Sequence, residues 1–134
     1  MSFLRQAFQR QRLAQSVEEL CQRLSESNRI LPGGYIYLSD LLSTPKLLQN
    51  IGRIIANAFK GQKIDAVMTV ATKGVPLANA VANILNVPFV IVRRDLKSQK
   101  VQPSQSTTRS ASSYRIEKMF LSKRSLKPNS RVLI

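Results

Sequence analysis

The fold is decided by residues 64–92, which read IDAVMTVATKGVPLANAVANILNVPFVIV. Residues 64–71 and 89–92 are almost continuously apolar, a pattern typical of strands that are covered on both faces. Between them, residues 75–85 carry Pro76 in the first turn, which predicts a helix. This helix contains small residues that favour close packing on a sheet: Ala78, Ala80 and Ala82. Strand, helix and strand in about 30 residues predict a parallel crossover.

The chain before this unit continues the α/β pattern. Residues 3–24 carry apolar side chains at spacings of three and four, which predicts an amphipathic helix with Cys21 on its buried face. Residues 30–38 predict an aromatic strand after a glycine turn. A helix is expected from Pro45 to Gly61, because proline suits a first helical turn and glycine suits an end.

The chain after this unit has a different composition. Residues 97–113 consist mainly of Gln, Ser, Thr and Lys without apolar periodicity, so we expect a mobile loop or an arm. Residues 114–121 alternate like a strand with an exposed edge, residues 127–130 predict a turn, and residues 131–134 begin another buried strand. The whole pattern predicts an α/β domain with a parallel sheet, flanking helices and a flexible loop.

Composition excludes several classes of protein. The chain is 43% hydrophobic, which suffices for a packed core, and has no apolar run long enough for a bilayer and no signal peptide, so we expect a cytoplasmic protein without a membrane partner. One cysteine and no histidine leave no internal disulfide, no transition-metal cluster and no histidine-dependent catalytic set. Asp65, which precedes a strand, is expected to be a turn residue rather than a base.

The charge is strongly basic and uneven. Of the net charge of +14, residues 93–131 carry +9, with 11 basic residues against Asp95 and Glu117. A basic surface favours nucleic acid, nucleotides or sugar phosphates. The alternative is a solvated surface whose balancing acidic residues lie elsewhere in the protein.

The turn after the first strand of the crossover is the main candidate site. Thr72 offers a hydroxyl, Lys73 an ammonium group, and Gly74 a close approach to the backbone at the positive end of the next helix. These groups suit a phosphate or a pyrophosphate. An ordinary strand-to-helix turn with an exposed lysine is the alternative.

Four segments in order resemble the Gram-positive purine operon repressor family: residues 29–40 (RILPGGYIYLSD), 67–78 (VMTVATKGVPLA), 85–95 (LNVPFVIVRRD) and 123–126 (KRSL). The resemblance runs from about residue 15 to residue 134. It implies a type I phosphoribosyltransferase fold that serves as the effector domain of a transcription factor, without catalytic or metal-binding residues of its own.

The resemblance also implies a site and its ligand. Ala71, Thr72, Lys73 and Gly74 match the family's pyrophosphate loop, and Tyr35 matches an aromatic residue beside the pocket, although packing under the glycine turn is an equal alternative for Tyr35. The implied effector is phosphoribosyl pyrophosphate, with or without magnesium, or a guanine nucleotide alarmone that competes for its pocket. The implied partners are a second copy of the chain and, in the intact protein, DNA.

The resemblance divides the chain into a connecting helix, residues 1–28, and the front part of the phosphoribosyltransferase-like domain, residues 29–134. It leads us to expect that the chain ends before the phosphoribosyl-binding loop and that a DNA-reading domain precedes it. Residues 106–115 fall on the family's flexible loop, where Arg109 and Tyr114 depart from the usual residues. We therefore expect part of a repressor of purine synthesis genes. A purine phosphoribosyltransferase of the xanthine or adenine type, or a fragment without activity, are the alternatives.

Overall fold

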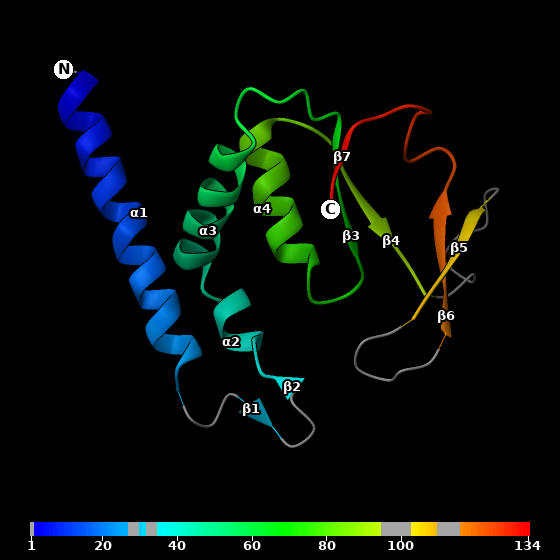
Figure 1. Ribbon diagram of the computed structural model, residues 1–134, viewed down its shortest axis with the longest axis horizontal. Helices are drawn as coiled ribbons and strands as arrows, with labels where there is room; N and C mark the ends of the chain where they lie inside the picture. Colours follow the sequence, from blue (N-terminus) through cyan, green and yellow to red (C-terminus); the bar gives the residue numbers. More distant parts are fainter. Residues whose placement is uncertain (1, 27–29, 32–34, 95–102, 110–115) are drawn as a thin grey trace.

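The computed structural model describes residues 2–26, 30–31, 35–94, 103–109 and 116–134 (Figure 1). Its central sheet has three parallel strands in the order β4 (Phe89–Val92), β3 (Ala66–Val70) and β7 (Val132–Leu133). The helix α4 (Val75–Leu85) connects β3 to β4. The parallel crossover that the sequence predicted is therefore confirmed, as is the start of a strand near the end of the chain.

The helices follow one another outward from the sheet. In Figure 1, α3 (Pro45–Ala58) lies beyond α4, and α1 (Ser2–Leu24) lies beyond α3. A short helix, α2 (Ser39–Leu42), precedes α3. Within the described residues, no helix combines the length and the apolar content that a membrane span requires.

The short aromatic strand predicted after the glycines within residues 30–38 is confirmed at Tyr35–Ile36, but the strand before the glycines was not anticipated. The structure has two short antiparallel strands, β1 (Ile30–Leu31) and β2 (Tyr35–Ile36), and the chain then turns into α2. The carbonyl oxygen of Asp40 accepts hydrogen bonds from Ser43 Oγ and Thr44 Oγ1, both at 2.9 Å. These side-chain hydrogen bonds favour a helical turn over an extended strand.

The core lies between α4, α3 and β3. Its buried members are Ala56, Val67, Ala78, Val81 and Ala82. Not all alanines of α4 face the sheet as expected: Ala80 meets α3, where a Cβ added to Gly52 would lie 3.1 Å from the Ala80 Cβ. The small residues thus allow the two helices to approach closely, as well as allowing α4 to pack on the sheet.

The segment of residues 97–113 contains a strand where the sequence predicted a loop or an arm. β5 (Pro103–Arg109) pairs antiparallel with β6 (Ile116–Ser122), and β6 joins the sheet through reciprocal backbone hydrogen bonds between Phe120 and Arg93, at 3.0 and 2.8 Å. Residues 104–108 are exposed, so neither face of β5 is buried. Without a buried face, β5 has no apolar alternation that would reveal it. The rest of the segment lies outside the described residues.

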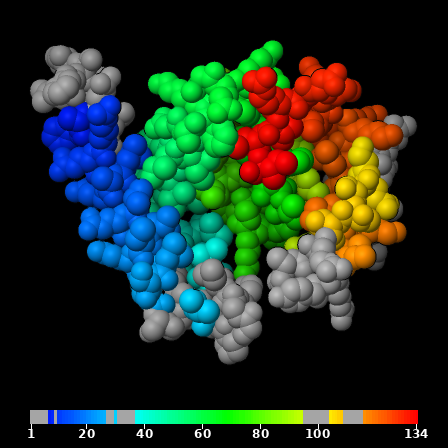
Figure 2. All heavy atoms as spheres, viewed as in Figure 1, coloured from blue at the N-terminus to red at the C-terminus, as the bar shows by residue number. Residues whose placement is uncertain are grey.

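The helix α1 buries only part of the apolar face that the sequence predicted. Cys21, expected in the core, is exposed, and Val17 and Leu24 are 43% and 40% exposed, whereas Leu13 and Leu20 are half-buried. The contact with α3 includes a polar pair: Ser16 is 5% exposed, and its Oγ accepts a hydrogen bond of 2.7 Å from Asn50 Nδ2. Figure 2 shows α1 along one edge of the body. The helix therefore leaves an apolar strip uncovered within the described part of the chain.

Asp65, which was expected in a turn, lies instead in irregular backbone directly before β3. Its Oδ2 accepts a hydrogen bond from the backbone N–H of Arg131, and its own N–H donates to the Arg131 carbonyl, both at 2.8 Å. These two hydrogen bonds fix the entry of β7 beside the entry of β3. The expected turn over residues 127–130 is present, with a left-handed Asn129 (φ 61°).

We expect Gly52→Val to lower the free energy of unfolding by roughly 1–3 kcal/mol, because the added methyl groups have no space against Ala80 and overpacking forces the helices apart. Urea unfolding followed by circular dichroism measures the change. Ala58→Val, at an exposed position of the same helix, is the control for β-branching. Equal midpoints for the two variants would contradict a close α3–α4 contact.

Candidate functional site

The four residues of the predicted site follow β3 and lead directly into α4, at the carboxyl end of the parallel sheet. This is the end at which open α/β sheets bind their ligands. The N–H of Ala71 donates to the Val92 carbonyl at 2.8 Å, which ties the start of the turn to the end of β4. The peptide bond between Ala71 and Thr72 is cis.

The turn presents its polar groups outward. Thr72 and Lys73 are exposed, whereas Ala71 and Gly74 are half-buried. Gly74 is the N-cap of α4 and has no side chain that could cap it; at the first two helical positions, Val75 donates its N–H to the Thr72 carbonyl at 3.2 Å and Pro76 has no N–H. The aligned peptide dipoles place a partial positive charge at this helix end, and Lys73 adds a full one. Hydroxyl, ammonium and amide groups around one turn are suited to bind a phosphate.

Gly74 is required by close packing inside the turn. A Cβ at this position would overlap Thr69 Oγ1, although the backbone angles (φ −73°, ψ −14°) suit any residue. The sequence predicted that Gly74 belongs to the turn, but it did not predict the contact between Gly74 and Thr69. That contact depends on how tightly the chain folds back after β3. The Thr69 side chain therefore limits position 74 of the turn to glycine.

Tyr35, the other predicted site residue, has its backbone on β2, opposite Leu31. Its side chain lies outside the described residues, so its place beside the pocket stays a prediction. Tyr114 also lies outside the described residues, and the backbone of Arg109 ends β5. Among the described residues, no three His, Cys, Asp or Glu side chains gather closely enough to hold a metal ion.

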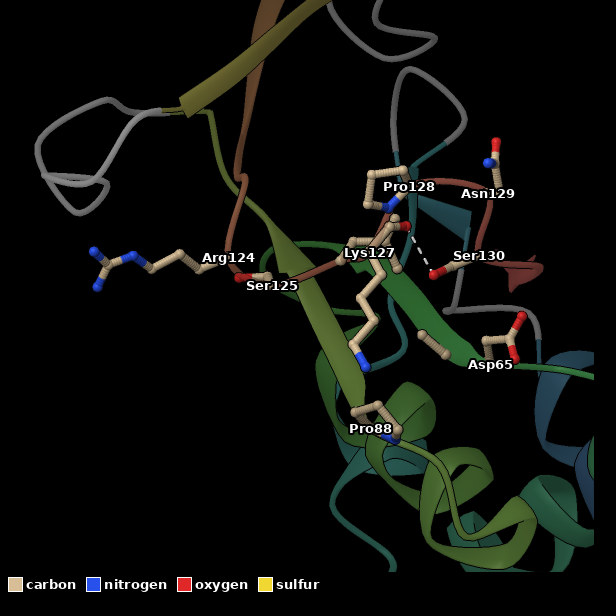
Figure 3. Close-up of a pocket in the computed structure, with 10 residues that line it drawn as sticks. Asp65, Pro88, Arg124, Ser125, Lys127, Pro128, Asn129 and Ser130 are labelled. Atoms are coloured by element: carbon tan, nitrogen blue, oxygen red, sulfur yellow. Dashed lines mark hydrogen bonds between the residues drawn. The ribbon is translucent and has the colours of Figure 1, made fainter.

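A hollow at the other end of the sheet was not anticipated from the sequence. It is lined by Asp65, Pro88 and residues 124–130, and thus lies where β3, β4 and β7 begin (Figure 3). It is separate from the turn after β3, since the two lie at opposite ends of that strand.

The fold and the turn define a class of protein. Residues 38–134 match the phosphoribosyl transferase domain, and the chain belongs to this family. Structural similarity agrees: an adenine phosphoribosyltransferase from Trypanosoma brucei, solved in complex with AMP, pyrophosphate and ribose-5-phosphate, superposes with a TM-score of 0.64. That structure is 25% identical, and the superposition covers 79% of this chain and 47% of the other. The predicted fold class is thus confirmed.

Within that class, the chain closely resembles transcriptional regulators. It is 73% identical to a probable purine biosynthesis transcriptional regulator PurR from Streptococcus pneumoniae over 88% of this chain. It is 55% identical to a purine biosynthesis transcriptional activator PurR from Lactococcus lactis over 87%, and 51% identical to a purine biosynthesis transcriptional repressor PurR from Bacillus subtilis over 88%. The chain spans 43%, 43% and 41% of these relatives. The resemblance to the purine regulator family is confirmed.

More distant relatives include enzymes. A xanthine phosphoribosyltransferase from Macrococcus caseolyticus is 27% identical over 88% of this chain and 63% of its own length. The domain boundary predicted between residues 28 and 29 stays a prediction, because residues 27–29 lie outside the described residues.

We expect Gly74→Ala to destabilise the domain by roughly 1–3 kcal/mol, because the new methyl group would displace the Thr69 hydroxyl. The double variant Thr69→Ala/Gly74→Ala should recover part of this loss, since Thr69→Ala removes the overlapping atom. Thermal unfolding of the two single variants and the double variant measures the coupling. Additive effects would show that Thr69 does not limit this turn.

Proposed function

We propose that the chain is the effector-binding part of a transcriptional repressor of purine biosynthesis genes, and that its effector is phosphoribosyl pyrophosphate. The observation that carries the proposal is the turn from Ala71 to Gly74: a hydroxyl, a lysine and a helix N-terminus at the carboxyl end of β3, in a chain 51–73% identical to purine regulators. Phosphoribosyl pyrophosphate carries a pyrophosphate group, which these groups are suited to bind.

Each residue of the turn has a distinct role in this proposal. Lys73 neutralises the charge of the pyrophosphate, Thr72 donates its hydroxyl, and the small Ala71 and Gly74 let the backbone approach the ligand. Magnesium bound to the diphosphate enters with the ligand rather than being held by a protein cluster. A guanine nucleotide alarmone also carries a diphosphate, so it competes for the same turn.

The proposed protein binds its effector without transferring the ribosyl group. The intact protein acts in the cytoplasm and binds DNA, as the function of a transcriptional regulator requires. Relatives named as an activator and a repressor are both similar to this chain, so the direction of regulation has to be tested in a reporter strain.

A purine phosphoribosyltransferase is the alternative function, supported by the similarity to a xanthine enzyme. Incubating the protein with phosphoribosyl pyrophosphate and xanthine, adenine, guanine or hypoxanthine distinguishes the two. Release of pyrophosphate with formation of a nucleotide would favour the enzyme.

The protein is further proposed to act as a homodimer. Support comes from Val17, Cys21 and Leu24, which lie at helical spacings on one side of α1 and are exposed. A second copy that packs on this strip would remove its apolar surface from water.

We expect Lys73→Ala to weaken binding of phosphoribosyl pyrophosphate by about 1.5–3 kcal/mol, because one charge-assisted contact is lost. Titration calorimetry in the presence of magnesium measures the affinity, and titration with pyrophosphate alone isolates the part of the ligand that contacts the turn. Lys60→Ala removes the same charge at an exposed position in the turn after α3 and serves as the control. An affinity that Lys73→Ala leaves unchanged would remove this lysine from the site.

We expect Val17→Lys/Leu24→Lys to convert a dimer into a monomer, because two buried charges cannot be paired across the apolar strip. Sedimentation velocity measures the mass, and circular dichroism verifies the fold. Gln22→Lys adds a charge on another side of the same helix and should leave the dimer intact. A dimer that tolerates both lysines would place the interface away from α1.

A further inference from the structure

The hollow at the amino ends of the sheet has the size and composition of a ligand site. Its volume is about 650 Å³, which lies within the usual range for small-molecule pockets. Its floor is formed where β3 and β4 begin, by Ala66 and Pro88. Its wall is the connection between β6 and β7, residues 124–130 (Figure 3). The strands and this connection come from distant parts of the sequence and together line an open hollow.

Two cationic side chains belong to this wall. Arg124 and Lys127 line the hollow; Figure 3 shows the Lys127 side chain extending toward Pro88, whereas the Arg124 side chain extends away from the other lining residues. Among the described residues, neither cationic group forms an ion pair, and residues 123–131 contain two further basic residues and no acidic one. The wall therefore carries positive charge that the described fold leaves uncompensated. It favours an anion.

The opposite wall offers an acceptor. Asp65 uses Oδ2 to accept the N–H of Arg131 at 2.8 Å, and within the described residues Oδ1 accepts no hydrogen bond. A simple anion would be repelled by this carboxylate. A ligand with an anionic group at one end and N–H donors at the other would instead satisfy both walls.

Apolar surface separates the two polar walls. Pro88, Pro128 and Leu126 contribute it, and the rigid proline rings need no ordering when a ligand binds. Such surface suits the planar face of a nucleobase. Amino or imino groups on the edge of the base would donate to Asp65, while the phosphates would contact Lys127.

We propose that this hollow is a second ligand site, and that it binds a nucleotide with its phosphates at Lys127 and its base toward Asp65. The site is independent of the turn after β3, because it lies at the other end of that strand and shares no residue with it. The proposal therefore stands whether or not phosphoribosyl pyrophosphate is the effector.

The test is a fluorescence anisotropy titration of mant-labelled GDP and ADP with the whole chain, repeated with the variant Lys127→Ala. This variant is expected to weaken binding by about tenfold, because a charge-assisted contact with phosphate is lost. Lys127→Arg should retain most of the affinity. Lys118→Ala removes the same charge at an exposed position of β6, outside the hollow, and should leave the affinity unchanged. This variant controls for the general attraction between a basic protein and an anionic ligand.

Two further variants distinguish binding in the hollow from binding at the turn after β3. The titrations are therefore repeated in the Lys73→Ala background, in which diphosphate binding at the turn is weakened. A mant-nucleotide affinity that no longer depends on Lys127 in that background would assign the nucleotide to the turn and overturn the proposal. Asp65→Asn keeps an acceptor for Arg131 but removes the charge, and should change the preference between guanine and adenine. No binding by the unmodified chain, or equal affinities for Lys127→Ala and Lys118→Ala, would also overturn it. The proposal would also be overturned if single-stranded DNA displaced the probe and this displacement required Lys127. The hollow would then be a contact surface for nucleic acid.

Discussion

The parallel pairing of β3 between β4 and β7 is the constraint on which the rest of the structure depends. It brings all three carboxyl ends to one edge of the sheet and all three amino ends to the other. A parallel connection requires a crossover helix, so the turn from Ala71 to Gly74 has to leave the sheet at its carboxyl edge. The position of the candidate phosphate site thus follows from strand direction before any side chain is considered.

Close packing then decides which residues these positions accept. Gly52 and Ala80 allow α3 to lie against α4, and Gly74 allows the chain to fold back over Thr69. The first contact fixes the direction of α4, and the second fixes the turn that begins it. A helix whose N-terminus is held in this way presents its amide groups in a defined direction, which a phosphate site requires.

The parts that could be predicted from the sequence are those in which burial imposes a pattern. The two inner strands and α4 have apolar or small residues where the core requires them, and the turn between them contains the residue types that phosphate binding needs. β5 could not be predicted, since both of its faces are exposed. Its backbone hydrogen bonds to β6 do not require any alternation of apolar and polar residues in the sequence. The buried face of α1 was predicted only in part: Leu13 and Leu20 are half-buried, but the polar contact between Ser16 and Asn50 depends on α3, which the pattern of a single helix does not report. The hollow forms because Asp65 and Arg131, which are far apart in sequence, are joined by hydrogen bonds. A local sequence pattern does not predict such a long-range contact.

The two ends of β3 raise the question of whether ligands there would influence each other. A strand of five residues spans about 17 Å at 3.3 Å per residue. Over that distance two unit charges in water interact by about 0.2 kcal/mol, and salt screens them further, since the Debye length is about 8 Å. Direct electrostatic coupling between anions at the two ends is therefore negligible. Coupling would therefore need movement of the backbone, and the start of β3 is joined to Arg131, just before β7, by two hydrogen bonds of Asp65. A ligand that contacts Asp65 in the hollow would act on that connection, and so on the pairing of β7 with the first two residues of β3.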